Sequence, residues 1–172
     1  MGQYFRPVII NAAGQPISAL NPRDYGAGDK IANHSRIGTP LMTAVEALLS
    51  LDGAARLVWA GDYDEPTPGQ PGLYWLTEPH HDVRFAGLVH DDTQPNTALP
   101  AHRGGQYICN PDKQQYINNA ELPRDHDGAQ RSPLPWLTAE GGFTNRPHWS
   151  WARDRIYLST EHPGTAWKPI TH

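Results

Sequence analysis

Cysteine is nearly absent from this chain of 172 residues, in which Cys109 is the only one. A single thiol excludes an internal disulfide and a zinc site built from cysteines. Structural disulfides are common in oxidising compartments and rare in reducing ones. The composition is therefore typical of a protein in a reducing compartment.

Basic residues are also scarce. The 14 Lys and Arg are outnumbered by 18 Asp and Glu, which leaves a formal net charge of −4. Nucleic-acid binding depends on clustered positive charge, so this balance argues against DNA or RNA as a partner. No apolar stretch approaches the roughly 20 residues of a membrane span, and because Met1–Pro7 lacks the pattern of a secretion leader we expect none. We therefore expect a cytoplasmic protein with no membrane partner.

Glycine and proline, by contrast, are abundant, with 16 and 17 residues. Chain breakers at this density predict many turns and short elements. Six Trp and seven Tyr supply the large apolar groups that disordered chains lack. The sequence therefore predicts one α+β domain over residues 1–172, built from antiparallel hairpins with few helices.

One helix is predicted over Thr39–Leu51, where Pro40 suits the first helical position and Leu41 and Val45 begin a helical spacing. Strands are predicted from β-branched and aromatic runs at residues 4–10, 17–20, 55–63, 73–77, 83–89, 106–109, 115–117 and 155–158. Pro7 cannot donate to a sheet ladder, which predicts an edge position for the first strand. Residues 160–172 are expected to be irregular.

Four short words recur in the same order along the chain. They are Gly2-Gln3-Tyr4 with Gly105-Gln106-Tyr107, Pro22-Arg23-Asp24 with Pro123-Arg124-Asp125, Thr39-Pro40-Leu41 with Ser132-Pro133-Leu134, and Trp59-Ala60-Gly61-Asp62 with Trp151-Ala152-Arg153-Asp154. The common order favours an internal duplication of residues 1–65 and 104–160, joined by a connector at 66–103. The alternative is that similar hairpin and loop units converge on similar turn chemistry.

Histidine and carboxylates occur together in three clusters. These are His80-His81-Asp82, His90-Asp91-Asp92 and Asp125-His126-Asp127. Imidazole and carboxylate are ligand types for zinc, iron or manganese, but none of the clusters has the spacing of a known metal motif. Solvated polar loops are the favoured interpretation, and no metal or other cofactor is assigned.

Residues 22–38 are the strongest candidate for binding an anion. A glycine-bearing loop leads here into the predicted helix, and free N–H groups at a helix N-terminus favour anions. Basic and hydrogen-bonding side chains gather in this segment, and Arg124 repeats Arg23 in the second half. The candidate ligand-binding residues are Arg23, Lys30, His34, Ser35, Arg36 and Arg124.

A catalytic alternative uses some of the same residues. The adjacent His34 and Ser35 are the residue types of an activated nucleophile, although no G-x-S-x-G elbow surrounds Ser35. Asp24, Asp62 and Asp154 are a candidate carboxylate set for acid–base chemistry. The plainer interpretation is a hydrogen-bonded structural histidine with aspartates that cap turns.

Longer motifs along the chain resemble a group of bacterial and phage or prophage proteins that has no established activity. The matching segments are Gly2–Phe5, Asp24–Lys30, His34–Gly38, Val58–Tyr63, Tyr107–Ile117, Pro133–Gly141 and Ser150–Ile156. The resemblance spans nearly the whole chain and implies a single domain in a phage or mobile-element context, without implying a mechanism. The group often continues with a glycine- and arginine-rich stretch where this chain has Gly142–Arg146, and that departure weakens the case for a shared anion site there.

These observations favour a non-catalytic accessory protein of the cytoplasm. It would bind a small anionic, nucleotide-like ligand or a host protein through residues 22–38 and 123–146. The alternative is a small hydrolase or transferase that uses His34 with Asp24, Asp62 or Asp154. Both classes stay open at this point.

Overall fold

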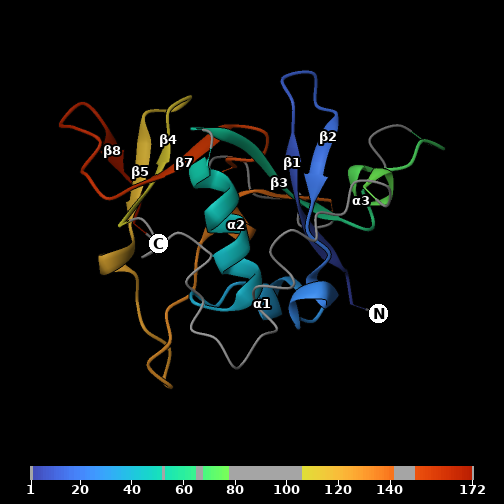
Figure 1. Cartoon of the computed structure of the whole chain (residues 1–172), viewed down its shortest axis with the longest axis horizontal. Coiled ribbons are helices and arrows are strands. Elements are labelled where there is room, and N and C mark those ends of the chain that lie inside the picture. The colour runs from blue at the N-terminus through green and yellow to red at the C-terminus, as the bar shows by residue number, and fades with distance from the viewer. Residues whose placement is uncertain (1, 52, 65–67, 78–105, 142–149, 172) are drawn as a thin grey trace.

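The computed structural model describes residues 2–51, 53–64, 68–77, 106–141 and 150–171. Within these ranges the chain forms a mixed, mostly antiparallel sheet with a few helices, which confirms the α+β prediction (Figure 1). The strands are β1 (Phe5–Ile10), β2 (Pro16–Ala19), β3 (Ala55–Gly61), β4 (Tyr107–Asn110), β5 (Gln115–Asn118), β6 (Ala139–Glu140), β7 (Arg155–Ser159) and β8 (Lys168–Pro169). The helical elements are η1 (Pro22–Tyr25), α1 (Ile31–His34), α2 (Pro40–Leu51), α3 (Leu73–Leu76), η3 (Asn119–Glu121) and α5 (Leu134–Leu137).

The sheet has the order β2-β1-β3-β7-β4-β5-β8, and the short β6 pairs in parallel with β3. Two hairpins, β1–β2 and β4–β5, lie in the segments where the sequence predicts them. In the second turn Asn110 accepts the Lys113 N–H through its Oδ1 at 3.0 Å. The prediction of a wholly irregular tail is wrong, because β8 adds to the sheet edge beside β5.

Strands β3 and β7 join the two sides of the sheet through a very short ladder. Ala55 pairs with Ile156 and Arg56 pairs with Arg155, and no further pair of these two strands is in register. A ladder of this length contributes few hydrogen bonds. The cohesion of the sheet therefore depends on the side chains that pack across the joint.

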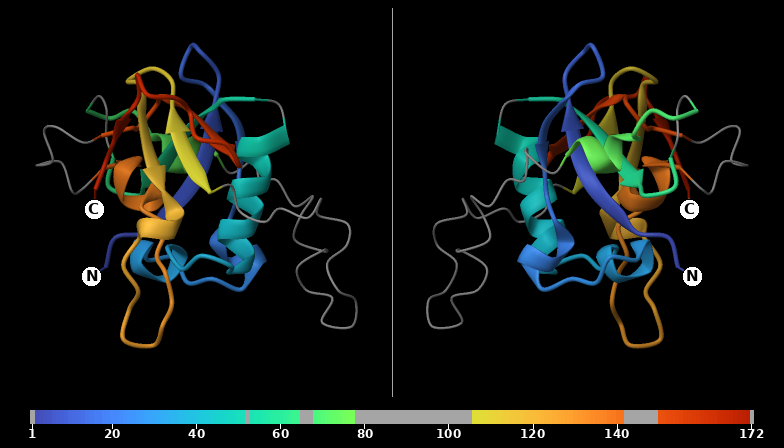
Figure 2. Two further views of the ribbon diagram at one scale, coloured as in Figure 1. Left: turned by 90° about the vertical axis from the view of Figure 1, so that its left-hand side faces the viewer. Right: turned by 90° about the vertical axis from the view of Figure 1, so that its right-hand side faces the viewer.

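Helix α2 lies along one face of the sheet, with α1 and η1 near its N-terminal end (Figures 1 and 2). The helix starts at Pro40, one residue inside the predicted range, and the chain turns after it at Gly53 with φ +79°. Glycine adopts this left-handed conformation without the penalty that a side chain brings. The bounds of α2 thus agree with the predicted helix to within one residue.

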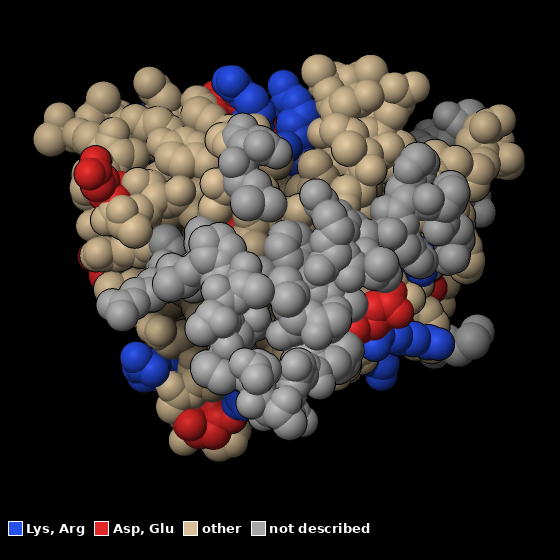
Figure 3. Space-filling view, viewed as in Figure 1, with Lys and Arg blue, Asp and Glu red and all other residues tan. Residues whose placement is uncertain are grey.

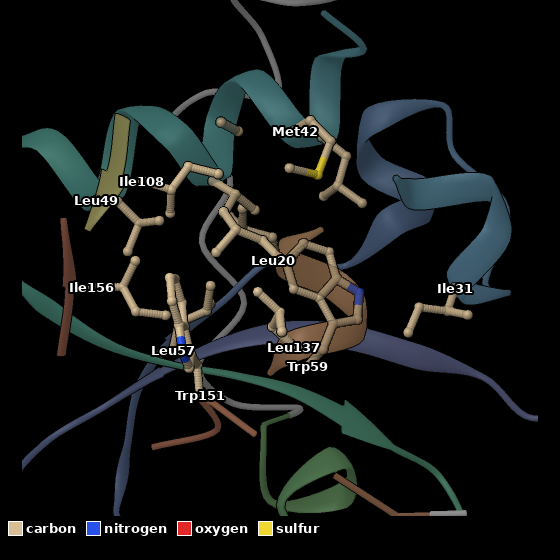
Figure 4. Close-up of a cluster of buried hydrophobic side chains, with 14 of the residues drawn as sticks. Leu20, Ile31, Met42, Leu49, Leu57, Trp59, Ile108, Leu137, Trp151 and Ile156 are labelled. Atoms are coloured by element: carbon tan, nitrogen blue, oxygen red, sulfur yellow. The ribbon is translucent and has the colours of Figure 1, made fainter. Parts of the chain in front are cut away.

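The main core fills the space between α2 and the sheet (Figure 4). Met42 and Leu49 of α2 face Trp59 of β3 and Ile156 of β7, and all four side chains are almost fully buried. Ile108 of β4 belongs to the same cluster. One core thus spans β3, β7 and β4 and holds the two sides of the sheet together.

The opposite face of the sheet carries a second, smaller core. Val58 of β3 points to this face while its neighbours Leu57 and Trp59 point to the main core, which is the alternation expected of a strand. Leu73 and Tyr74 of α3 cover this second cluster.

The predicted strand at residues 73–77 is wrong, because Leu73–Leu76 form a single helical turn. Aromatic and apolar content alone does not separate a strand from a short buried helix. The turn buries Leu73 and Tyr74 together and leaves Trp75 and Leu76 exposed, whereas a strand would have buried alternate residues.

The predicted edge position of the first strand is also wrong, because β1 lies between β2 and β3. Pro7 is opposite Trp59, whose N–H donates to Thr138 on the side away from β1. Pro7, which has no N–H, therefore turns its backbone nitrogen and carbonyl towards the β2 side. Its partner on that side is Leu20, the residue after the end of β2, whose N–H donates to the Pro7 carbonyl at 3.0 Å. A proline is tolerated inside this sheet because the neighbouring ladder ends at that point.

On each side of the joint of β3 and β7 a hairpin lies next to the central strand, while β8 pairs with β5 on one side and β6 pairs with β3, the central strand of the other. The repeated sequence words, however, occupy unlike places. Trp59 lies within β3 whereas Trp151 precedes β7, and Pro40 opens a 12-residue helix whereas Pro133 precedes the four residues of α5. The duplication of residues 1–65 and 104–160 stays a prediction.

Several predictions concern segments outside the described residues. These are the strand at 83–89, the clusters at 80–82 and 90–92, and most of the connector at 66–103. The described part of that connector, residues 68–77, contains α3 and packs on the sheet.

A core variant tests whether the joint depends on packing. Ile156→Ala removes a fully buried side chain beside the two-pair ladder, and we expect the free energy of unfolding to fall by about 3 kcal/mol. The matched variant Ile17→Ala changes an isoleucine that is 59% exposed, so its loss should stay below about 1 kcal/mol. Urea denaturation measures both, and equal losses would contradict this account of the joint.

Candidate functional site

His34 is a fully buried residue at the end of α1. Its Nδ1 accepts a hydrogen bond from the Trp59 Nε1–H at 3.0 Å, and its Nε2 contacts the Gly28 carbonyl oxygen. An accepting Nδ1 and a carbonyl partner at Nε2 require the neutral tautomer with its proton on Nε2. The imidazole thereby ties the glycine-bearing loop to the centre of the sheet.

Burial lowers the pKa of His34 from 6.5 to about 4, because the charged form would lose its hydration. The Gly28 carbonyl and the Asp29 carboxylate oppose this shift more weakly. At neutral pH the ring is uncharged and both of its nitrogens are engaged. It therefore has no nitrogen available in this structure to accept a proton from a substrate.

Ser35 is buried as well and hydrogen-bonds away from the imidazole. Its hydroxyl contacts the Ala32 carbonyl at 3.4 Å and accepts from Arg131 Nη1 at 3.0 Å. The pair predicted as a nucleophile and its base is thus divided between two separate networks. A hydrogen bond between nucleophile and base is the usual geometric sign of such a pair.

The structure does not gather the three candidate aspartates around His34. Asp62 follows β3 and accepts the Tyr4 N–H at 3.0 Å. Asp154 precedes β7, where it accepts from Asn110 Nδ2 at 2.9 Å and contacts Lys113. Asp24 lies half-buried in η1.

The distance between these carboxylates follows from the sheet. Asp62 lies beyond the last residue of β3, whereas Asp154 lies near its first residue, since Ala55 pairs with Ile156. Seven extended residues span roughly 20 Å. That separation is too great for one acid–base site.

The predicted anion-binding arginines are already engaged by the protein itself. Arg23 donates to Asp29 at 2.6 and 2.8 Å, Arg36 pairs with Asp127, and Arg124 donates to the Gly128 carbonyl at 2.8 Å. Lys30 is exposed, with its side chain against Gly2. Arg23 and Arg36 are therefore neutralised by carboxylates of the protein itself.

Arg131, which the sequence analysis did not single out, joins the two predicted loops. It donates to Asp125 at 2.7 Å and to the Ala32 carbonyl at 2.9 Å, in addition to Ser35. Arg36 and Arg131 also form an isolated bridge between the two segments. The loops at 22–38 and 123–131 are thus side by side, while residues 142–146 lie outside the described part of the chain.

No group of three or more His, Cys, Asp and Glu that would hold a metal ion occurs in the ranges that the structure describes. Of the three His and Asp clusters, only Asp125-His126-Asp127 falls within these ranges. Its two carboxylates pair with Arg131 and Arg36.

Exposed aromatic side chains gather around Asp62, a feature that sequence reasoning missed. The large apolar side chains with at least two-fifths exposure here are Tyr4 (42%), Tyr63 (56%), Trp75 (54%) and Leu76 (46%). The Asp62 N–H donates to the Tyr4 carbonyl, and the Asp62 carboxylate accepts the Tyr4 N–H. The Asp62 carbonyl accepts the Trp75 Nε1–H at 3.1 Å. We call these four side chains and Asp62 the aromatic corner.

Buried contacts hold the aromatic corner in place from below. The Arg6 guanidinium lies 3.8 Å from the centre of the Tyr74 ring and donates to Thr77 Oγ1 at 3.1 Å. Tyr74 in turn contacts Trp75 edge to face, with 5.0 Å between ring centres. The exposed Trp75 is therefore presented by a fixed helical turn. Tyr63 and Trp75 are aromatic residues that the sequence shows directly. A strand over residues 73–77 does not indicate that Trp75 and Leu76 face solvent, because it would expose alternate residues.

In comparisons with known proteins, no family model, curated protein or solved structure matches the chain. Among the described helices, none combines the length and the hydrophobicity that crossing a bilayer requires.

Two buried titratable groups have opposite effects on how stability depends on pH. Because burial lowers the pKa of His34, the unfolded chain binds that proton more tightly, and stability falls as the pH drops from 6.5 towards 4. Burial raises the pKa of Glu46 in α2 from 4.5 to about 7, so stability rises as the pH drops from 7 towards 4.5. The two effects nearly cancel in the wild-type protein between pH 4.5 and 6.5.

The variant Glu46→Gln should therefore expose the contribution of His34. We expect the free energy of unfolding of this variant to fall by about 3 kcal/mol as the pH drops from 6.5 to 4, whereas the wild-type value changes much less. Urea denaturation at a series of pH values measures this difference. The exposed control Glu121→Gln should follow the wild-type profile, and a level profile for Glu46→Gln would contradict the burial of a neutral His34.

Proposed function

We propose that this protein is a non-catalytic binding module that docks a protein partner through the aromatic corner. The observation that carries this proposal is that four residues with exposed large apolar side chains are bonded to Asp62 or adjacent in sequence to Asp62 or Trp75. Contiguous exposed apolar surface marks interaction sites in monomeric proteins. Tyr and Trp are also the residue types that are enriched at protein interfaces.

The state of His34 supports binding over catalysis. A general base needs a nitrogen within reach of substrate, whereas both nitrogens of this ring are engaged inside the core. The aspartates of the hydrolase or transferase alternative are dispersed along the sheet. We therefore favour the binding module over that alternative.

The chemistry of the corner suggests what a partner offers. Tyr63 and Trp75 provide broad apolar faces, and Asp62, which is next to Tyr63 in sequence and bonded to Trp75 through its carbonyl, adds a half-buried carboxylate. A complementary surface has an apolar centre flanked by a Lys or Arg side chain. Because α3 is held by Arg6 and Thr77, binding costs little ordering of the corner.

The setting of this interaction is part of the proposal. The motifs at Asp24–Lys30 and Val58–Tyr63 resemble those of phage and prophage proteins, in which case the partner is a protein of the bacterial host. We place the interaction in the cytoplasm, with which the free, buried thiol of Cys109 agrees. The small-anion version at residues 22–38 receives less support, because Arg23 and Arg36 are paired with carboxylates.

The test is a capture experiment with matched variants. The tagged wild-type protein is used as bait in a bacterial cytosolic extract, and the affinity of any stoichiometric partner is then measured with purified components. Tyr63→Ala with Trp75→Ala should weaken that affinity by at least about tenfold, because interface aromatics dominate binding energy. Both side chains are more than half exposed, so the fold should survive the change.

The control is Trp167→Ala, which removes an aromatic side chain beside the opposite edge of the sheet, where it contacts Tyr157. This variant should bind the partner as the wild type does. A partner that binds the double variant with unchanged affinity, or the absence of any stoichiometric partner, would refute docking through the corner.

A further inference from the structure

An open groove lies between the β1–β2 hairpin and the C-terminal end of α2. Its volume is about 370 Å³, which falls in the lower range of small-molecule sites. The large apolar side chains that line it are Ile9, Ile10, Ile17 and Leu48. Arg56 and Arg155 line it as well, and no acidic residue is among its described lining. In Figure 3, Lys and Arg side chains gather at the upper edge of the molecule, between α2 and the hairpin.

Ile17 reaches the groove because the hairpin contains a β-bulge. Ile9 pairs with Ser18 while Ile10 pairs with Pro16, so Ile17 is the extra residue of β2. The Ile17 side chain is 59% exposed, which is a high exposure for a large apolar side chain. Bulges often occur beside functional sites, where they redirect a side chain.

Among the residues that the structure describes, Asp112 is the carboxylate that pairs with both arginines of the groove. Asp112 accepts the Arg155 backbone N–H at 2.7 Å and the guanidinium of the same residue at 2.7 Å. Arg56 is 3.6 Å from that carboxylate, and its Nη1 donates to the Arg153 carbonyl at 2.9 Å. One carboxylate therefore serves two guanidinium groups and is held mainly by Arg155.

We infer that this groove binds a small amphipathic carboxylate, with its apolar body against Ile17 and Leu48 and its carboxylate on Arg56. The planar guanidinium matches a carboxylate in geometry and charge. The apolar walls provide the favourable burial that a purely ionic ligand lacks. The apolar walls and the Arg56 guanidinium together complement a molecule that has an apolar body and one negative charge.

This site is separate from the aromatic corner. The groove lies at the first residues of β3, near Ala55 and Arg56, whereas the corner follows its last residue, Gly61. Roughly 20 Å of extended strand separates them. The groove proposal therefore does not depend on the proposed protein partner.

Three probes test the inference by isothermal titration calorimetry on the full chain. The first is 2-naphthoate, which has a rigid apolar body and a carboxylate. The second is 2-naphthamide, which has the same shape without the charge, and the third is inorganic phosphate, which has charge without an apolar body. We expect 2-naphthoate to bind at least about tenfold more tightly than either of the others.

Variants then locate the bound probe. Arg56→Gln removes the proposed carboxylate partner, and Ile17→Asp places a repelling charge on an exposed wall, so each should weaken 2-naphthoate by about tenfold or more. Lys168→Gln, which removes an exposed cation from the edge strand β8 away from the groove, should leave the affinity unchanged. Arg124→Gln tests the loops as the other location for the anion. Circular dichroism checks that each variant is folded, and Ile17→Asp keeps the test decisive if Arg56→Gln disturbs β3.

Several results would overturn the inference. They are no binding of 2-naphthoate, equal binding of 2-naphthamide, or unchanged affinity in folded Ile17→Asp. Loss of affinity in Arg124→Gln alone would place the anion on the loops instead.

Discussion

The buried hydrogen bonds of His34 are the constraint on which much of this structure depends. An imidazole in a low-dielectric core needs partners for both nitrogens, because an unsatisfied buried polar group costs about 1–3 kcal/mol. Trp59 from the sheet and Gly28 from the loop provide them. The loop between η1 and α1 is thereby fixed against β3, and α2 begins from a defined position above the sheet.

Trp59 connects this constraint to the rest of the fold. The same indole that donates to His34 packs in the core that spans β3, β7 and β4. Because β3 and β7 share only two residue pairs, this core keeps the two sides of the sheet in register. The groove is at Arg56, near the first residue of β3, and the aromatic corner is beyond Gly61, its last residue. The two proposed binding surfaces therefore lie at opposite ends of the strand that carries Trp59.

Local sequence signals predicted the elements that local chemistry determines. Pro40 at a helix start acts within a few residues, and the helix that it opens agrees with the prediction to within a residue. The strands predicted at 106–109 and 115–117 likewise form a hairpin. Pro7 was misplaced because its tolerance depends on where a neighbouring strand ends, which is a tertiary property. The strand predicted at residues 73–77 is wrong because Leu73–Leu76 form a helical turn that packs Leu73 and Tyr74 on the second core, and this tertiary contact has no signal in the local sequence.

The site residues show the same division. Adjacency of His34 and Ser35 indicated chemistry, but adjacency does not show where a side chain points, and the fold sends the two into different networks. Arg36 resembled part of an anion site because its partner Asp127 is distant in sequence. The partner of Arg23, Asp29, lies in the same segment, but sequence alone does not show that the two side chains pair. Arg56 and Ile17 gave no signal, since the groove exists only where the bulge meets the end of α2.

The most direct test of the account is the protonation of His34, observed by long-range proton–nitrogen NMR as the pH is lowered. Nitrogen shifts distinguish a protonated Nε2 from an accepting Nδ1 and follow the ring as it gains a second proton. The account predicts a single neutral tautomer with the proton on Nε2, which persists until the pKa is reached at about pH 4. A ring that exchanges between tautomers and titrates near its ordinary pKa of 6.5 would contradict it and would return His34 to the candidates for catalysis.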